Sequence, residues 1–391
     1  MIDLSLLTDG GVGWLDASGP SSHLVLSTRI RLARNLAGRV FQGRNSETER
    51  EDILQIVESA ARDTVLLRRA IKFRLDRLER TDRQLLHERH LVSKELAGLD
   101  ADGRVRSGAS ILVQDRLGVM LNEEDHLRLQ GLHSGFALDA AYAEVDRLDA
   151  ELGQRLAFAF HSEFGYLTSC PTNVGTGLRA SVLIHLPGLV LTKEISKVLQ
   201  GLAQVGLTFR GLYGEGSEVV GNFFQLSNQT TLGSSEYELL DHLGKMVRQV
   251  MDYEEQARQV LLRDAPSIIE DKVWRAYGLL RYARALSFEE AMNLLSGVRL
   301  GVGVSLIPDV VVAATGFRAG LADIVSVPGR QLPPEWPRST GPAIDLPNLH
   351  LIGQTNPLSG QLNEIRIEAG RIARAIRDEL ASNSGRQGLS K

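Results

Sequence analysis

The spacing of hydrophobic and polar residues predicts a mixture of helices and strands over the first 235 residues. Hydrophobic residues that recur at steps of three and four are typical of a helix with one buried face. This pattern occurs at residues 47–70, 132–160 and 192–205. Short runs of apolar and β-branched residues predict strands. They occur at residues 118–121, 181–186 and 219–226. Such a mixture is typical of α/β and α+β domains.

After Ser235 the hydrophobic pattern is that of helices alone. Long helices are expected at residues 237–263 and 267–285. Ser287 and Glu290 have the capping-box spacing, in which each side chain bonds the backbone N–H of the other, so a third helix is expected to begin there.

The change of pattern predicts two domains, at residues 1–250 and 251–391, of which the second is all helical. Six prolines between residues 328 and 347 predict a proline-rich loop inside the second domain. The tail from residue 382 consists mostly of small and polar residues and is expected to be flexible.

Composition excludes several classes of protein. A chain of 391 residues that is 43% hydrophobic can form two or three folded domains. One cysteine excludes a disulfide scaffold and a cysteine-rich zinc site, and a net charge of -4 argues against an obligate nucleic-acid-binding protein. Neither a targeting segment nor a membrane-spanning stretch is visible, so we expect a cytoplasmic protein with no membrane partner and no direct nucleic-acid partner.

The basic residues are divided unevenly, into 37 arginines and seven lysines. Codon bias in the genome is the simplest explanation. The functional explanation is phosphate binding, because a planar guanidinium matches phosphate oxygens better than an ammonium group does.

Two segments concentrate chemically active side chains. Residues 121–128 place three acids, a histidine and Arg128 directly after an expected strand. They form either a solvated strand-to-helix turn with a capped helix or part of a binding site, and this segment alone does not decide between the two. Residues 169–180 combine the single cysteine, Cys170, with a glycine-rich turn whose backbone N–H groups can bind an anion. A lone cysteine is otherwise most often a small buried hydrophobic residue.

Two further segments carry arginines. Arg29 and Arg31 lie two positions apart in an extended segment, which places them on one side of it. Residues 209–217 form a glycine-punctuated loop with one arginine and one glutamate. The phosphate-loop and protein-kinase glycine motifs are absent. The segments together predict a polyphosphate site formed by arginines from separate parts of the chain, in which Glu124 and Glu215 could clamp a planar cation.

Five blocks of the sequence resemble the catalytic signatures of the guanidino (phosphagen) kinase family and occur in the family's order. They are STRIRLARN (27–35), NEEDHLR (122–128), CPTNVGTGLRAS (170–181), RGLYGEGSE (210–218) and SNQTTLGSSE (227–236). The resemblance implies an α+β fold, in which a catalytic domain with an antiparallel sheet flanked by helices precedes an all-helical C-terminal domain.

The chain further resembles the bacterial protein-arginine kinase branch of that family. The first arginine block starts at Ser27, so the N-terminal helical domain that encloses a small guanidine in creatine and arginine kinases is expected to be absent, leaving the pocket open to a protein side chain. Residues 286–307 resemble the dimerisation domain of the branch. The RDxxRA motif, which forms a phosphoarginine pocket in the branch, is missing. The basic residues 362–377 are expected to form a solvated helix rather than a phosphate pocket, which stays the alternative, and residues 328–347 look like an insertion.

The resemblance implies roles for individual residues. Glu124 would accept the guanidinium proton, Glu215 would help to hold the guanidinium, and Cys170 would be the reactive cysteine beside it. The implied nucleotide-binding residues are Ser27, Thr28, Arg29, Ile30, Arg31, His90, Arg128, Arg179, Ala180, Ser181, Val182, Leu183, Arg210, Gly211, Leu212, Tyr213, Gly214 and Glu215. ATP and Mg²⁺ are the implied cofactors, and no side chain is assigned to the metal.

The implied function is transfer of the γ-phosphoryl group of ATP to arginine side chains of proteins, in a homodimer formed through the C-terminal domain. Such marks would direct proteins to a Clp ATPase and protease or serve stress regulation, with a zinc-binding activator protein as a further partner. Two alternatives stay open: a kinase of a small guanidine such as free arginine, and a non-enzymatic adaptor that binds arginine-rich clients.

Overall fold

The computed structural model describes residues 7–100, 103–212, 219–306, 341–342 and 350–351. The chain forms two compact units, of which unit 1 comprises Met1–Val219 and Phe223–Gln256 and unit 2 comprises Val220–Asn222 and Ala257–Lys391. The division falls within helix α6 (Glu236–Asp264), and the domain boundary predicted after residue 250 lies in the same helix.

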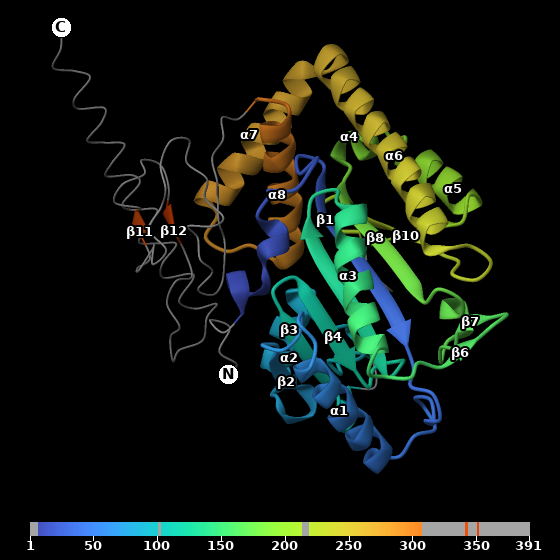
Figure 1. The fold of residues 1–391 in the computed structure, drawn as a ribbon. Helices are drawn as coiled ribbons and strands as arrows, with labels where there is room; N and C mark the ends of the chain where they lie inside the picture. The colour runs from blue at the N-terminus through green and yellow to red at the C-terminus, as the bar shows by residue number, and fades with distance from the viewer. Residues whose placement is uncertain (1–6, 101–102, 213–218, 307–340, 343–349, 352–391) are drawn as a thin grey trace, which may run out of the picture. The chain divides into compact units, whose positions relative to one another are not determined.

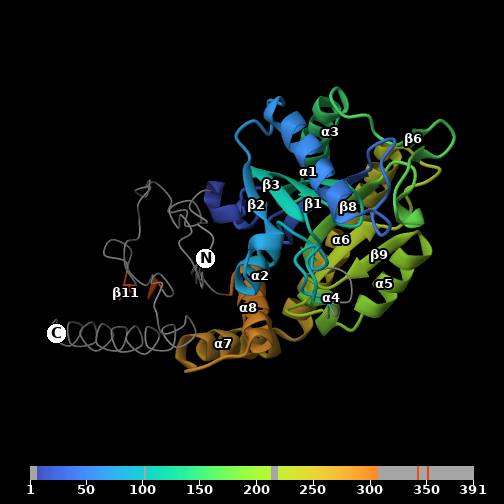
Figure 2. The same cartoon turned by 90° about the horizontal axis from the view of Figure 1, so that it is seen from below.

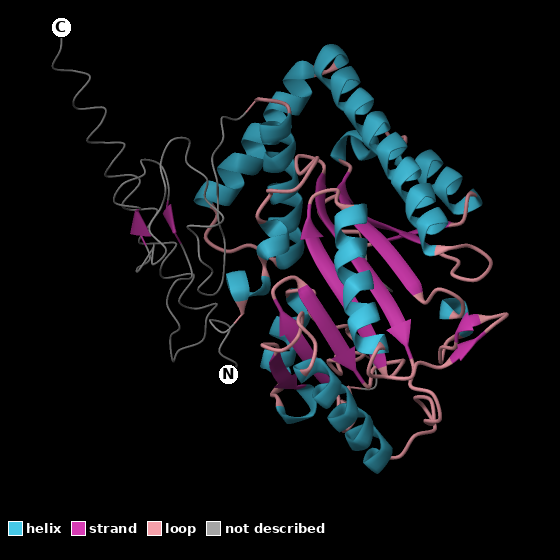
Figure 3. Cartoon of the chain, in the orientation of Figure 1, coloured by secondary structure: helices cyan, strands magenta, loops and turns pink. Residues whose placement is uncertain are grey.

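Unit 1 is built on an eight-stranded sheet in which all neighbouring strands are antiparallel (Figures 1 and 3). From edge to edge the strands are β2 (Ile71–Arg74), β3 (Ser110–Gln114), β4 (Leu117–Leu121), β5 (Leu127–Ser134), β1 (Val25–Arg34), β8 (Leu178–His185), β10 (Phe223–Asn228) and β9 (Leu207–Arg210). Strand β1 therefore lies in the middle, between two strands that are distant from it in the sequence. The expectation of an antiparallel sheet flanked by helices is confirmed.

Helix α3 (Leu138–Gly153) lies across one face of the sheet and packs against β1 and β5 (Figure 1). Gly131 of β5 allows the helix to come close, because a Cβ atom there would lie 2.6 Å from Val145 Cγ2. Ile30 pairs with Gly131 and is fully buried, so the even-numbered residues of β1 point toward α3. The odd-numbered residues of β1 point to the other face.

Further helices of unit 1 flank the sheet. They are α1 (Glu47–Arg62), α2 (Arg80–Glu88), α4 (Pro187–Leu191), α5 (Ile195–Gln204) and the first part of α6. Helix α5 packs beside the edge strand β9 (Figure 2). A complete capping box between Ser46 and Glu49 begins α1, which ends at Arg62, earlier than the predicted residue 70.

The helix predicted over residues 132–160 is wrong at both ends, because α3 spans only Leu138–Gly153. Residues up to Ser134 belong to β5, so the segment 121–128 connects two strands and is not a strand-to-helix turn. Gly135, with a φ of +67°, turns the chain between β5 and α3. The Thr28 hydroxyl secures this turn by donating to Gly135 O at 2.7 Å. The apolar residues that recur at helical steps, Ala141, Val145, Leu148 and Leu152, all lie inside α3, so their spacing indicates the helix but not where it begins.

Unit 2 contains α7 (Pro266–Tyr282) and α8 (Phe288–Gly303), which pack against each other. The side chain of Ser287 accepts a hydrogen bond from Glu290 N at the start of α8, as the capping pattern predicts. A two-residue ladder joins β11 (Gly341–Pro342) to β12 (His350–Leu351). None of the described helices has the length and apolar character needed to cross a membrane.

Three predictions concern segments outside the described residues. They are the proline-rich loop at residues 328–347, of which only 341–342 are described, the basic segment 362–377, and the tail from residue 382.

Candidate active site

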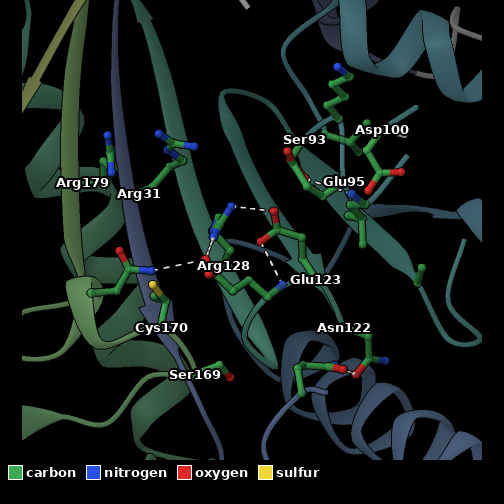
Figure 4. Close-up of a pocket in the computed structure, with 18 of the residues that line it drawn as sticks. Arg31, Ser93, Glu95, Asp100, Asn122, Glu123, Arg128, Ser169, Cys170 and Arg179 are labelled. Carbon is green, nitrogen blue, oxygen red and sulfur yellow. Dashed lines mark hydrogen bonds and ion pairs between the residues drawn. The ribbon is translucent and has the colours of Figure 1, made fainter. Parts of the chain in front are cut away.

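The register of the central strands gathers five arginines on the face of the sheet opposite α3. Arg31 lies directly across from Arg179 on β8, and its strand neighbour Ala33 lies across from Arg128 on β5. The five residues, which line one cavity of about 690 Å³ in unit 1, are Arg29, Arg31, Arg128, Arg179 and Arg210. Figure 4 shows three of them on adjacent strands at the same cavity as Cys170.

These arginines form a buried cluster of like charge. Burial, reinforced by Arg128 and Arg179, lowers the pKa of Arg29 to about 10. The same causes, with Arg29 itself among them, hold the pKa of Arg31 well below its ordinary value. Arg29 Nη2 donates to the neutral amide Oε1 of Gln225 at 3.0 Å, and Arg31 Nε has no hydrogen-bond partner among the described residues. A polyanion is the ligand that would relieve this repulsion.

Arg128 forms two ion pairs with neighbouring carboxylates. Its Nη1 donates to Glu123 Oε1 at 2.6 Å, and its Nη2 donates to Glu124 Oε2 at 2.9 Å. Burial alone would lower the pKa of Arg128, but these carboxylates raise it above its ordinary value. The Glu123 side chain is 3% exposed and that of Glu124 is 43% exposed, so Glu124 is the carboxylate that a ligand in the cavity can reach.

Glu124 and Cys170 face the same part of the cavity. Burial raises the pKa of the Glu124 carboxyl above its ordinary value, and Arg128 and the Cys170 thiol oppose this shift. Asn173 Nδ2 donates to Glu124 Oε2 at 3.4 Å. The Cys170 Sγ lies 3.0 Å from the Thr172 hydroxyl oxygen. A carboxylate with a raised pKa is a suitable proton acceptor near neutral pH.

The loop that carries Cys170 is held by residues to which the sequence analysis assigned no role. Asp125, which is fully buried, accepts hydrogen bonds from Ser169 N at 2.6 Å and from Asn35 Nδ2 at 2.7 Å. The Thr231 hydroxyl bonds the carbonyls of Thr172 and Val174, at 2.9 and 2.7 Å. Both residues lie in blocks that resemble the family signatures, NEEDHLR and SNQTTLGSSE. Residue type and spacing did not indicate that they hold this loop.

Two glycines allow this loop to lie against its neighbours. Gly177 has a φ of +66°, and a Cβ atom there would lie 2.6 Å from Ala33 O of β1. Gly175 has a φ of +112°, and a Cβ atom there would lie 2.3 Å from Thr231 O. The glycines of the CPTNVGTGLRAS block are thus required by the close approach of the loop to β1 and to the segment that carries Thr231.

The opposite wall of the cavity comes from the end of α2 and the segment that follows it. Its lining residues are His87, His90, Val92, Ser93, Lys94, Glu95 and Leu96, followed by Asp100, Arg104 and Arg106. His90 is 8% exposed, and burial, with Arg29 and other cations, holds its pKa well below the ordinary value. Burial and the neighbouring cations therefore disfavour the charged form of this imidazole.

The other implied nucleotide-binding residues are placed differently. Thr28, Ile30, Ala180 and Val182 are fully buried on the α3 side of the sheet. Ser27, Ser181 and Leu183 line a small hollow of about 10 Å³ beside Arg29. Gly211 and Leu212 follow β9 directly, and Tyr213, Gly214 and Glu215 lie outside the described residues. The roles of these twelve residues stay predictions.

Within the described part of the chain, no group of three or more His, Cys, Asp or Glu side chains could hold a metal ion. Mg²⁺ usually keeps several water ligands and is bound by one or two carboxylates together with substrate phosphates. The carboxylates of this cavity fit a magnesium ion that enters with a nucleotide as part of the substrate.

Comparison with known proteins agrees with this arrangement. Residues 52–257 match the family model described as ATP:guanido phosphotransferase, C-terminal catalytic domain, and residues 266–316 match the protein-arginine kinase McsB C-terminal domain. The chain is 47% identical to the protein-arginine kinase of Symbiobacterium thermophilum over 300 residues, which cover 76% of this chain and 84% of that protein. It is 43% identical to that of Pelotomaculum thermopropionicum, over 82% of this chain and 91% of the relative.

Solved structures show the same fold. The duplicated taurocyamine kinase from Schistosoma mansoni matches with a TM-score of 0.55 and 27% identity, over 65% of this chain and 35% of that longer one. Lombricine kinase matches with a TM-score of 0.53 and 23% identity, over 65% of this chain and 70% of that one, which supports the fold alone. By its sequence relatives, its two matching domains and its sheet of converging arginines, this chain belongs to the guanidino kinase family and, within it, to the protein-arginine kinase branch.

Proposed function

We propose that this protein transfers the γ-phosphoryl group of Mg-ATP to the guanidinium group of arginine side chains in proteins. The observation that carries the proposal is the convergence of five arginines, Glu124 and Cys170 on one cavity. The arginines suit the phosphate end of the reaction, and the carboxylate and the thiol suit the guanidinium end.

At the phosphate end, the arginines bind and orient the triphosphate. Phosphoryl transfer spreads negative charge over the oxygens of the moving group, so catalysis depends on positioning and charge neutralisation. Arg29, Arg31 and Arg179 come from adjacent strands of one sheet, whose pairing sets the spacing of their backbone positions. Mg²⁺, bound as part of the substrate, would neutralise further charge when it is present.

At the guanidinium end, the difficulty is that the group is protonated and its lone pairs are delocalised. Glu124 can accept the proton as a guanidinium nitrogen forms its bond to the γ-phosphorus and the bond to the β-phosphate oxygen breaks, releasing ADP. The raised pKa of Glu124 suits this transfer. The Cys170 thiol lies beside the same carboxylate, where its sulfur would contact the bound guanidinium. Glu215 is proposed as the second carboxylate that holds the guanidinium flat.

The proposal assigns a protein as the substrate because the relatives are named protein-arginine kinases and residues 266–316 match a domain specific to them. The proposal extends to the assembly and the setting that the resemblance implies. These are a homodimer through the C-terminal domain, a zinc-binding activator, delivery of marked proteins to a Clp ATPase and protease, and a role in stress response in the cytoplasm.

The test is incubation of the protein with Mg-ATP and a disordered, arginine-rich protein, followed by mass spectrometry without acid treatment. Acid-labile phosphate on arginine is expected, and Glu124→Gln should abolish most of it. Excess free L-arginine should neither compete nor become phosphorylated, whereas competition would favour the small-guanidine alternative. If no phosphate is incorporated although calorimetry shows ATP binding, the proposed activity is wrong.

A further inference from the structure

The N-terminal segment of unit 1 packs against the cavity wall that carries His90. Trp14 lies in a 3₁₀ turn (Gly13–Leu15) and is 8% exposed. Its ring meets the imidazole of His90 edge-on, with ring centroids 4.7 Å apart and an angle of 66° between the planes. Aromatic rings in this arrangement attract each other beyond the effect of burial alone.

The same segment is fastened to this wall at a second place. Leu7 is 5% exposed and belongs to the buried hydrophobic cluster that contains Leu91 and Leu96. The guanidinium of Arg89 donates a hydrogen bond to Gly10 O. The segment that carries Trp14 is therefore anchored directly to residues on either side of His90.

His90 is a residue whose position needs support. Its φ of +59° lies in the left-handed region, which side chains other than glycine adopt at a cost. Gln130 Nε2 donates to His90 O at 3.2 Å and to Leu91 O at 2.9 Å, which fixes the backbone. The contact with Trp14, in contrast, acts on the imidazole ring itself.

We propose that Trp14 is a positioning residue for nucleotide binding, which holds the imidazole of His90 in place at the cavity through their edge-to-face contact. Trp14 is not among the described residues that line the cavity, so it acts through His90 and does not touch the ligand. The inference rests on the proposed use of the cavity for ATP.

Trp14 could contact His90 through its ring surface or through its indole N–H group. Within the described residues, Nε1 of Trp14 is buried and has no hydrogen-bond partner. The ring surface, not the N–H group, therefore supplies the contact with His90. A phenylalanine at this position should keep most of the contact, whereas an alanine should lose it.

The main experiment compares Trp14→Ala and Trp14→Phe with Leu15→Ala, a control in the same 3₁₀ turn whose side chain is 43% exposed. Calorimetry gives the Kd for ATP, and steady-state kinetics give kcat and both KM values. Trp14→Ala should weaken ATP binding roughly tenfold, because one aromatic contact contributes about one factor of ten to the affinity. The KM for ATP should rise, whereas kcat and the KM for the protein substrate should change little. Trp14→Phe and Leu15→Ala should behave like the parent protein.

The inference is overturned if the Trp14→Ala variant has the same melting temperature as the parent protein and the same Kd for ATP. A parent protein that binds no ATP would refute the proposed function instead. If the Trp14→Ala variant does not fold, a second variant tests the inference. It carries Trp274→Phe and Trp336→Phe, so that Trp14 is its only tryptophan. Its fluorescence should change on ATP addition and saturate with the calorimetric Kd. Unchanged emission despite bound ATP would equally overturn the inference.

Discussion

A buried ion pair connects the sheet, α3 and the active-site loop, and its removal tests how unit 1 is held together. Arg34 is 2% exposed. Its Nε and Nη2 donate to the two carboxylate oxygens of Asp149, at 3.0 and 2.8 Å, and its Nη1 donates to Ala33 O and Thr176 O, at 2.8 and 2.9 Å. The guanidinium carbon lies 3.5 Å from the centre of the Tyr166 ring. We predict that Asp149→Asn destabilises unit 1 strongly.

The magnitude follows from the environment of the guanidinium. Removal of one partner of a buried ion pair costs about 3–5 kcal/mol, because the other charge stays buried without compensation. The lower end applies here, since Arg34 keeps its two bonds to carbonyl oxygens and the new asparagine keeps one acceptor. A loss of about 3 kcal/mol reduces the folding equilibrium constant about a hundredfold. With an m value of about 3 kcal/mol/M, the urea midpoint should fall by about 1 M.

Urea unfolding followed by circular dichroism measures this shift. The matched control is Asp241→Asn, which removes the partner of Lys245 in an ion pair of 2.6 Å whose side chains are 56% and 63% exposed. An exposed pair of this kind contributes about 0–1 kcal/mol, so the control should barely move the midpoint. Equal shifts for Asp149→Asn and Asp241→Asn would refute the reasoning, since burial would then not determine the cost.

Three further predictions concern the site itself. Glu124→Gln should slow phosphoryl transfer by roughly 10²–10⁴-fold, because an amide cannot accept the guanidinium proton. Calorimetry should show that the affinity for ATP changes by less than about threefold. Arg128 opposes the burial that raises the Glu124 pKa. A general base works only above its pKa, so Arg128→Gln should move the acid limb of the kcat/KM profile to higher pH, and an unmoved limb would mean that another group titrates there. In thermal melts, Gly177→Ala should lower the unfolding free energy by about 2 kcal/mol more than Gly38→Ala does. Both glycines have φ near +70°, but only at Gly177 would a Cβ atom meet the backbone, at Ala33 O. Equal losses would show that the clash is relieved without cost.

The sequence predicted the parts of the site that depend on local alternation. Arg29 and Arg31 lie two residues apart in an extended segment, and the structure places both on one face of β1. That Arg128, Arg179 and Arg210 reach the same face depends on the pairing of β1 with β5 and β8 and of β10 with β9. Pairing between distant strands leaves no local pattern, so the sequence could suggest that arginines from separate segments meet but not which strands bring them together.

The residues that position the site were beyond sequence reasoning for a related reason. Asp125 lies among acids that could have been catalytic, yet it is fully buried and holds Ser169 N and Asn35. Trp14 is far from His90 in the sequence, and no motif connects them. Long-range hydrogen bonds and ring contacts are set by the tertiary fold, whereas residue type and spacing report only what a segment can do by itself.

The two faces of the central sheet contribute differently to stability. On the α3 side, residues such as Ile30 and Val145 are fully buried, and burial of apolar surface favours folding. On the other side, burial of the arginines and, after it, their mutual repulsion lower the pKa of Arg29 and oppose folding. A ligand that binds only the folded state adds stability that grows with its concentration, about 2.7 kcal/mol at a hundred times its Kd. The α3 side and the Arg34–Asp149 pair must therefore hold the sheet together before a polyanion arrives, and the arginine side becomes stabilising only when the cavity is filled.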